Sequence, residues 1–189
     1  RRVLFRSNPL APSADPSRPT ELPEGNWEVA VFENRFPSLT PGASPPNAAP
    51  GAIVAPACGK CEVVVFGQAA TVSLGRLGDD RVALILEVLA ERTRALADDG
   101  ALYVLPFENR GAEMGVTLGH PHGQIYAYRF MPRRQALQTA HLKSYFDREQ
   151  RDLLGDIAQT EMRLGLRLLD QRGDAVSFVP PFARFPYEI

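Results

Sequence analysis

The spacing of apolar residues along the chain predicts several short strands and two helices. Apolar positions at helical spacing predict one helix over residues 79–98, started by Asp79 or Asp80 and ended at Gly100, and a second over residues 149–165. Together with the strands given next, these helices indicate an α+β fold, in which helices cover an antiparallel sheet. Runs rich in β-branched and aromatic residues predict strands over residues 29–32, 62–66, 102–107 and 124–130, and a hairpin over 166–170 and 175–179 that turns at Arg172-Gly173-Asp174.

Two long segments lack this periodicity. Residues 8–25 are rich in proline, serine and charge, which predicts an extended lead-in, and residues 40–56 contain five prolines, which predicts a loop. The first seven residues resemble the in-frame translation of a sequencing-library adapter. We therefore expect residues 1–7 to be a sequence artefact and exclude them from reasoning about the fold.

The most informative motif is Gly-His-Pro-His-Gly-Gln at residues 119–124. Side chains two residues apart in an extended run point to the same side, so we expect His120, His122 and Gln124 on one face. Pro121 fixes its own φ and favours extended backbone at the residue before it, which stiffens this arrangement. Neutral imidazole is a nucleophile, and a group that binds its other ring nitrogen selects the tautomer that attacks. The motif therefore indicates nucleophilic chemistry at a histidine.

The same motif is similar to that of a known family. His-Pro-His-Gly-Gln at residues 120–124, preceded by Phe-Glu-Asn-Arg-Gly at residues 107–111, resembles galactose-1-phosphate uridylyltransferase, a branch of the histidine triad superfamily. The similarity extends, in the family's order, to residues 26–39, 61–66 and 178–188.

This resemblance implies a domain organisation. A histidine-triad-like antiparallel sheet with covering helices would occupy residues 26–165, and residues 166–189 would be the truncated start of a second repeat. The chain would then be roughly the amino-terminal half of a longer enzyme. The second repeat would complete the sugar side of the active site and a homodimer.

The resemblance also implies a reaction and the residues that perform it. The uridylyl group would pass from UDP-glucose to galactose 1-phosphate, as in the Leloir pathway of galactose metabolism, through a uridylyl-histidine intermediate. His122 would be the nucleophile, His120 would position it, and Gln124 would stabilise the phosphate. The further positions that match nucleotide- or phosphate-binding residues of the family are Asn34, Arg35, Asn109, Gly115, Thr117 and Gly123.

Two alternative functions remain open from the sequence. A related nucleotidyltransferase or phosphorylase acting on ADP-glucose or on dinucleoside polyphosphates would share the nucleophile and differ in base recognition. A catalytically incomplete nucleotide-binding fragment is the second alternative, because by the resemblance residues 1–189 would hold only the start of the second repeat.

The two cysteines have the spacing of half a zinc site, Cys58-Gly-Lys-Cys61. A structural site needs four ligands, and the chain has only three histidines, one of them the proposed nucleophile. By the resemblance, zinc-containing members carry ligands where this chain has residues 8–11 and Ala70, and iron-containing members carry a glutamate where it has Gln138. We therefore expect no metal and no cofactor.

Composition restricts the partners. The 21 basic and 22 acidic residues are spread without a dominant block, which argues against nucleic-acid and membrane-surface binding and leaves small anions such as UDP-hexose and hexose 1-phosphate. No apolar run approaches the roughly 20 residues that span a bilayer, and Val3-Leu4-Phe5 is too short for the apolar core of a signal peptide. We expect a cytoplasmic protein.

Overall fold

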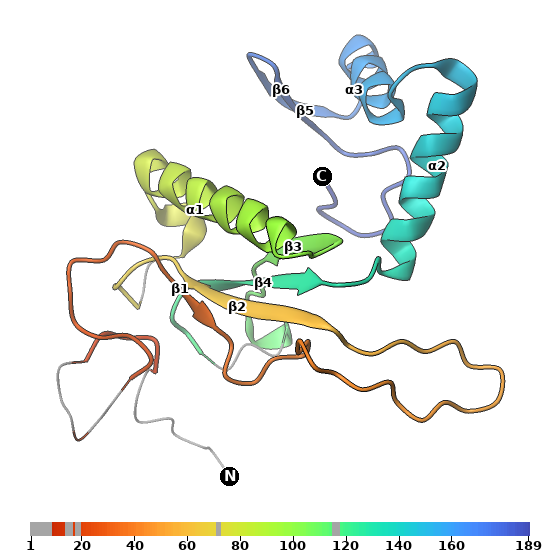
Figure 1. The fold of residues 1–189 in the computed structure, drawn as a ribbon. Coiled ribbons are helices and arrows are strands. Elements are labelled where there is room, and N and C mark those ends of the chain that lie inside the picture. The colour runs from red at the N-terminus through yellow and green to blue at the C-terminus, as the bar shows by residue number, and fades with distance from the viewer. Residues whose placement is uncertain (1–8, 14–16, 18–19, 71–72, 115–117) are drawn as a thin grey trace. The chain divides into compact units, whose positions relative to one another are not determined.

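A computed structural model describes residues 9–13, 17, 20–70, 73–114 and 118–189 of the chain. The chain forms two compact units, which join in the sequence between Met131 and Pro132 (Figure 1). These two units are separated by how compactly each part of the chain packs. The domains predicted above, residues 26–165 and 166–189, follow the family's repeats, so that division stays a prediction.

The first unit contains a sheet in which all neighbouring strands are antiparallel, as predicted. Within the described residues the sheet has four strands in the order β1-β2-β4-β3 (Figure 1). Because β4 lies between β2 and β3, it is paired on both sides from Gln124 to Tyr128, whereas Gly123 and His122 are paired with β2 alone. The strands are β1 (Ala30–Glu33), β2 (Gly59–Val65), β3 (Tyr103–Phe107) and β4 (His122–Tyr128), and short 3-10 helices occur at η1 (Leu74–Arg76) and η2 (Ala112–Met114).

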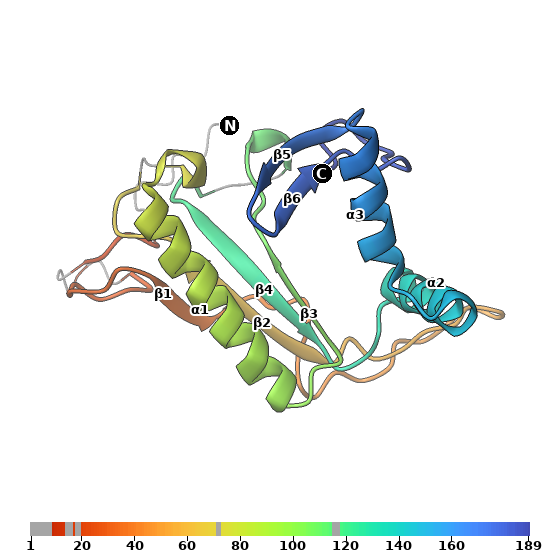
Figure 2. The ribbon, with the colours of Figure 1, turned by 90° about the horizontal axis from the view of Figure 1, so that it is seen from above.

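Helix α1 (Asp79–Asp98) lies along one face of this sheet (Figure 2). Its bounds confirm the helix predicted over residues 79–98. The predicted cap is wrong, since Gly78 is the N-cap and neither aspartate caps by its side chain. Asp79 and Asp80 instead occupy the first turn, where their charge favours the helix dipole. Gly100 follows the helix with a φ of 95°, a left-handed conformation that glycine adopts without strain.

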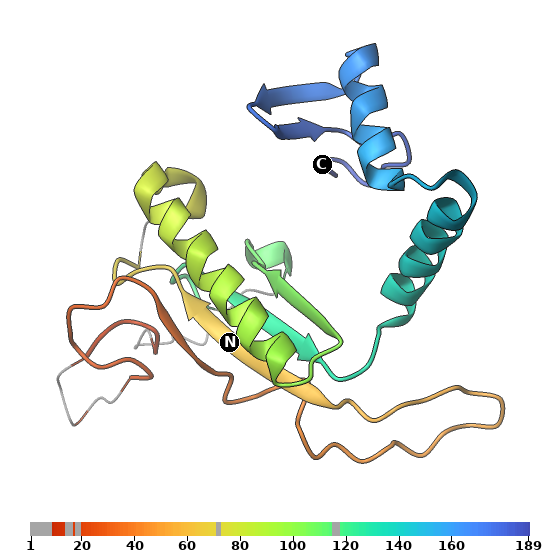
Figure 3. The ribbon, with the colours of Figure 1, turned by 45° about the horizontal axis from the view of Figure 1, so that its top comes forward.

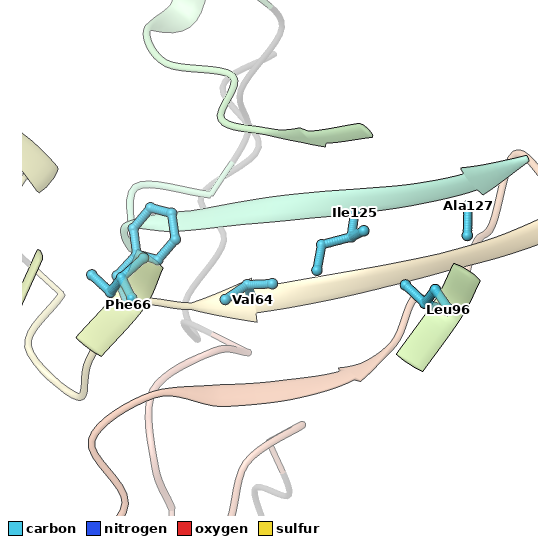
Figure 4. Packing of buried hydrophobic residues seen from close by; sticks show 6 residues of the cluster. Val64, Phe66, Leu96, Ile125 and Ala127 are labelled. Carbon is cyan, nitrogen blue, oxygen red and sulfur yellow. The ribbon is translucent and has the colours of Figure 1, made fainter. Parts of the chain in front are cut away.

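The main core lies between α1 and the sheet (Figure 4). Alternate residues of β2 and β4 point toward the helix, which contributes the buried Ile85 and Leu96. Burying one such side chain stabilises the fold by roughly 2 kcal/mol. The buried residues of this cluster are Val64, Phe66, Ile85, Leu96, Ile125 and Ala127.

The lead-in covers part of the opposite face. Leu10 and Leu22 are buried in a second cluster with Val65 of β2. The main-chain N–H of Glu21 donates to the carbonyl of Pro9 at 2.9 Å, so the described part of the lead-in folds back on itself. The prediction of an extended lead-in is therefore wrong, because burial of the two leucines favours a compact path.

Residues 41–57 form the predicted loop. The loop extends from the sheet between β1 and β2 (Figure 3), and a bridge between Thr40 and Cys58 closes its base. Its proline content prevents regular strand pairing over this length.

The second unit contains two helices and a hairpin within its described residues. The hairpin turns at Gly173, whose φ is 57°, as predicted. The predicted second helix begins later than residue 149, because Asp152 caps it by accepting from the N–H groups of Leu154 and Gly155. The first helix of this unit was not predicted. The elements are α2 (Arg133–Glu149), α3 (Leu153–Leu164), β5 (Leu168–Arg172) and β6 (Ala175–Phe178).

No helix in the described parts of the chain combines the length and apolar character that crossing a bilayer requires.

Candidate active site

His122 and Gln124 lie on the face of β4 that points away from α1. Burial alternates along the strand, so that Gly123, Ile125 and Ala127 are buried while the two polar side chains are half-buried. The predicted alternation holds for this pair. Their side chains can therefore reach a ligand without disturbing the core.

The ring of His122 is oriented by the main chain. Its Nδ1 lies 2.7 Å from the carbonyl oxygen of His120. A carbonyl can only accept a hydrogen bond, so Nδ1 carries the proton and donates. In the neutral ring the lone pair is then on Nε2, the nitrogen farther from the backbone.

His120 was predicted to share a face with His122 and Gln124, but its side chain is buried. It precedes the strand, is 2% exposed, and its Nε2 donates to the carbonyl of Gly67 at 2.7 Å. The N–H of Phe66 also donates to the carbonyl of Pro121 at 3.2 Å. These two hydrogen bonds hold the segment before β4 against the end of β2. His120 thereby fixes the carbonyl that orients His122.

Gln124 is oriented by Asn34, which follows β1. The Asn34 Oδ1 accepts from the N–H of Phe36 at 2.9 Å, which identifies the other end of the amide as Nδ2. That Nδ2 donates to Gln124 Oε1 at 3.3 Å. The Gln124 Nε2 has no hydrogen-bond partner among the described residues, so its two donors can bind an anion.

Gly123 has a packing reason to be glycine. A Cβ built at this position would lie 2.9 Å from Phe66 Cζ and 3.0 Å from the carbonyl oxygen of Phe107. Any side chain would push β4 away from its neighbours and move His122 and Gln124 with it.

A cavity of about 400 Å³ opens over this face of the sheet. It brings together six of the predicted site residues, which come from the segment after β1, from β4 and from the loop after β3. Gly115 and Thr117 lie outside the described residues. The predicted residues that line the cavity are Asn34, Arg35, Asn109, His122, Gly123 and Gln124.

A second cavity of about 310 Å³ adjoins the first. His122, Asn109 and Leu118 line both, so the proposed nucleophile lies between the two spaces. Arg110 lines the second cavity, with its Nε 3.4 Å from the carboxylate of Glu108. A group attached to His122 could therefore contact partners on either side.

Sequence reasoning did not find the lead-in residues of the first cavity. Pro9, Leu10 and Glu21 line it together with Phe32 and Phe36. The aromatic pair lies within the segment whose resemblance was noted, but a glutamate in a proline-rich lead-in carries no signal of its own.

The two cysteines lie in different surroundings. Cys61 is buried in β2, and the half-buried Cys58 lies three residues away, an odd separation that directs strand side chains to opposite faces. The Cys58 Sγ contacts the carbonyl of Ala43 at 3.6 Å. No group of three or more histidine, cysteine or acidic side chains within the described residues is arranged to hold a metal ion.

Comparison with known families relates this site to a class of enzymes. Residues 6–132 match the family described as galactose-1-phosphate uridyl transferase, N-terminal domain. The chain belongs to the galactose-1-phosphate uridylyltransferase family. The match covers both proposed histidines and all of the sheet, so the site lies inside the family domain.

Curated relatives of the uridylyltransferase family align with most of this chain. A galactose-1-phosphate uridylyltransferase of Streptomyces lividans is 38% identical over 182 residues, which is 96% of this chain and 46% of the relative. The same enzyme of Thermotoga maritima is 33% identical over 172 residues, 89% of this chain and 53% of the relative. The chain thus spans about half the length of the curated relatives it matches.

Solved structures confirm the fold of the uridylyltransferase family. A structure described as that of a uridylyltransferase has a TM-score of 0.83 and 31% identity, and covers 96% of this chain and 57% of its own. An ADP-glucose phosphorylase from Arabidopsis thaliana has a TM-score of 0.63 at 22% identity, covering 82% of this chain and 47% of its own, a likeness in fold alone.

Proposed function

We propose that the protein transfers a uridylyl group from UDP-glucose to galactose 1-phosphate through a covalent intermediate on His122. The observation that carries this proposal is the 2.7 Å hydrogen bond from His122 Nδ1 to the His120 carbonyl. This bond leaves the Nε2 lone pair of the neutral ring available for attack. The family name and the names of the relatives support the choice of substrates.

The first step forms a bond between His122 Nε2 and the α-phosphorus of UDP-glucose. The bond from that phosphorus to the bridging oxygen breaks, and glucose 1-phosphate leaves with the electron pair. The proton on Nδ1 stays hydrogen-bonded to the His120 carbonyl, so the uridylylated ring is cationic. A cationic imidazole is a good leaving group, which prepares the second step.

The second step reverses the first with another sugar phosphate. A phosphate oxygen of galactose 1-phosphate attacks the same phosphorus, and His122 leaves as the neutral ring. Negative charge on the phosphoryl oxygens needs preorganised donors in both steps. The Gln124 Nε2 supplies two donors, and we assign Gly115 and Thr117 to the same task by the family resemblance.

The first cavity has room for the nucleotide. Its volume of about 400 Å³ falls within the range of small-molecule sites, roughly 300 to 1,000 Å³. Val63 and Phe32 give it an apolar floor between β1 and β4. ADP-glucose, a rival substrate, has only the shared fold in its favour.

Intact-mass measurement after mixing the protein with UDP-glucose tests the proposal. The wild-type protein gains the mass of one uridylyl group, and His122→Asn gains none, because no other described side chain of the cavity offers an imidazole nucleophile. His141→Asn is the matched control, since this exposed histidine lies on α2 in the second unit. An adduct on His122→Asn would contradict the assignment.

We further propose that the full-length enzyme is a cytoplasmic homodimer that needs no metal and binds neither nucleic acid nor membrane. The opposed directions of Cys58 and Cys61 in and beside β2 support the absence of zinc. Purified protein is expected to hold no stoichiometric zinc or iron by elemental analysis, and chelators should leave its melting temperature unchanged. One tightly held zinc ion per chain would contradict this expectation.

A further inference from the structure

Glu21 forms part of the wall of the first cavity, although it belongs to the lead-in. Its main-chain N–H donates to Pro9 at 2.9 Å, and the adjacent Leu22 is buried beside Leu10 and Val65. These contacts fix the backbone at Glu21 against the sheet. Its side chain is 25% exposed, so the carboxylate is partly withdrawn from water yet accessible from the cavity.

Arg35 holds this carboxylate. Its Nη2 lies 2.9 Å from Glu21 Oε1, and its own side chain is 68% exposed. Apart from His122, these two are the ionisable residues among those that line the cavity. The Glu21 Oε2 has no partner among the described residues, so it can accept a hydrogen bond from a ligand.

Glu21 and Arg35 line the same cavity as the proposed nucleophile and come from segments outside β4. Arg35 follows Asn34 at the end of β1, and β2 separates β1 from β4. Two strand spacings are about 10 Å, which is comparable with the reach of a nucleoside beyond its 5′-phosphate. A nucleotide whose phosphate contacts His122 and Gln124 would extend toward Glu21.

The hydrogen-bonding chemistry of a carboxylate determines which part of the nucleotide Glu21 can bind. An ionised carboxylate only accepts hydrogen bonds and repels phosphate. The edge of uracil offers one N–H between two carbonyl oxygens, which would face the carboxylate unfavourably. The ribose diol offers two hydroxyl donors without that conflict.

We propose that Glu21, positioned by Arg35, accepts a hydrogen bond from the ribose 2′-hydroxyl and makes the site selective for ribonucleotides. This inference rests on the proposed function, because it requires a nucleotide in the first cavity. Arg35 also offsets the negative charge that a lone carboxylate would bring to a site for anions.

Binding of UMP and 2′-deoxy-UMP, measured by isothermal titration calorimetry, tests the inference without using catalysis. The wild-type protein is expected to bind UMP roughly tenfold more tightly than 2′-deoxy-UMP, the value of one hydrogen bond to a charged group. Glu21→Gln should lose most of this preference. Glu24→Gln, an exposed change in the same lead-in, should keep it.

Several outcomes would overturn the inference. These are equal affinity of the wild-type protein for the two nucleotides, failure to bind either, or an unchanged preference in Glu21→Gln. If Glu21→Gln does not fold, Glu21→Asp keeps the charge on a shorter side chain and should show a reduced preference. If His122 is uridylylated but the protein shows no ribose preference, only the proposed role of Glu21 is contradicted. If the protein shows the ribose preference but no labelling, only the proposed transfer reaction is contradicted.

Discussion

Three polar side chains at the start of β4 are each held by a different partner. His120 donates to the Gly67 carbonyl, His122 donates to the His120 carbonyl, and Gln124 accepts from Asn34. The first two hydrogen bonds act in series, because the residue that binds Gly67 also carries the carbonyl that orients the next ring. A change at His120 should therefore affect the geometry of His122 without removing the nucleophile.

We expect His120→Asn to slow uridylylation by up to about a hundredfold while leaving the adduct detectable. Asparagine can still donate near Gly67, but its shorter side chain leaves space in a buried site. Rapid-quench measurement of adduct formation checks this, with UMP affinity as a separate readout that should change little. Complete loss of labelling, equal to that of His122→Asn, would mean that His120 takes part in the chemistry.

Sequence reasoning could predict part of this site because the period of a strand is fixed. Alternation was sufficient to direct His122 and Gln124 to one face. It could not show that His120 is buried, since the bend before β4 and the approach of Gly67 depend on tertiary packing. Glu21 was not predictable for the same reason, because only the folded lead-in brings it to the cavity.

At the scale of elements, Asp99 joins the end of α1 to the sheet. Lys60 of β2 donates to its Oδ2 at 2.8 Å, and Arg129 after β4 lies 3.4 Å from the same oxygen. The hydrogen bond from Lys60, with the charges of Lys60 and Arg129, lowers the pKa of Asp99 below its ordinary value of 3.8. These cations also offset the unfavourable negative charge at a helix C-terminus.

We expect Asp99→Asn to lower the melting temperature by at most a few degrees at pH 7, since exposed ion pairs contribute little. A carboxyl whose pKa is lower in the folded state stabilises it above the unfolded pKa and loses this effect as pH falls through the folded pKa. The difference between variant and wild type should thus shrink as pH falls below the ordinary pKa and through the lowered one. Thermal unfolding followed by circular dichroism measures it.

Asp98→Asn is the matched control for this pH dependence. Asp98 is exposed at the end of the same helix and has no ion-pair partner within the described residues. Removing its charge should leave stability unchanged or slightly increased at pH 7. A similar loss in both variants would show that the effect does not depend on the contacts of Asp99 with Lys60 and Arg129.

The helices differ in how far the sequence could predict them. α1 buries one side against the sheet, so its apolar residues recur clearly and its bounds were predicted. α2 has no buried residue, its N-cap Pro132 gives no side-chain cap, and it ends at Gln150 in a left-handed conformation in place of glycine. A side-chain N-cap and a C-terminal glycine are both missing, so little in the sequence predicted this helix.

At the scale of the whole molecule, the second unit has much apolar surface. A groove of about 510 Å³ is lined by Ile157, Val176 and Phe178 among others. Phe182, Phe185 and Ile189 are 61%, 68% and 72% exposed. Exposed apolar surface of this kind drives association in water.

We expect the 189-residue chain to self-associate in a concentration-dependent manner. The double change Phe182→Ser and Phe185→Ser should shift the sedimentation coefficient toward that of a monomer, because it removes two exposed aromatic rings from this surface. Analytical ultracentrifugation over a range of protein concentrations measures this. Ile53→Ser, which removes a fully exposed residue from the loop of the first unit, should leave self-association unchanged. A monodisperse wild-type monomer at every concentration would contradict the prediction.

The hydrogen bond between His122 and the His120 carbonyl also affects which mutations can disturb the site. In many enzymes an orienting group is a side chain, and a single codon change can delete it. Here the acceptor is a peptide oxygen that all amino acids share, so no missense mutation removes it directly. Genetic variation could alter the tautomer of His122 only by displacing the backbone, as a change at His120 or Gly123 would.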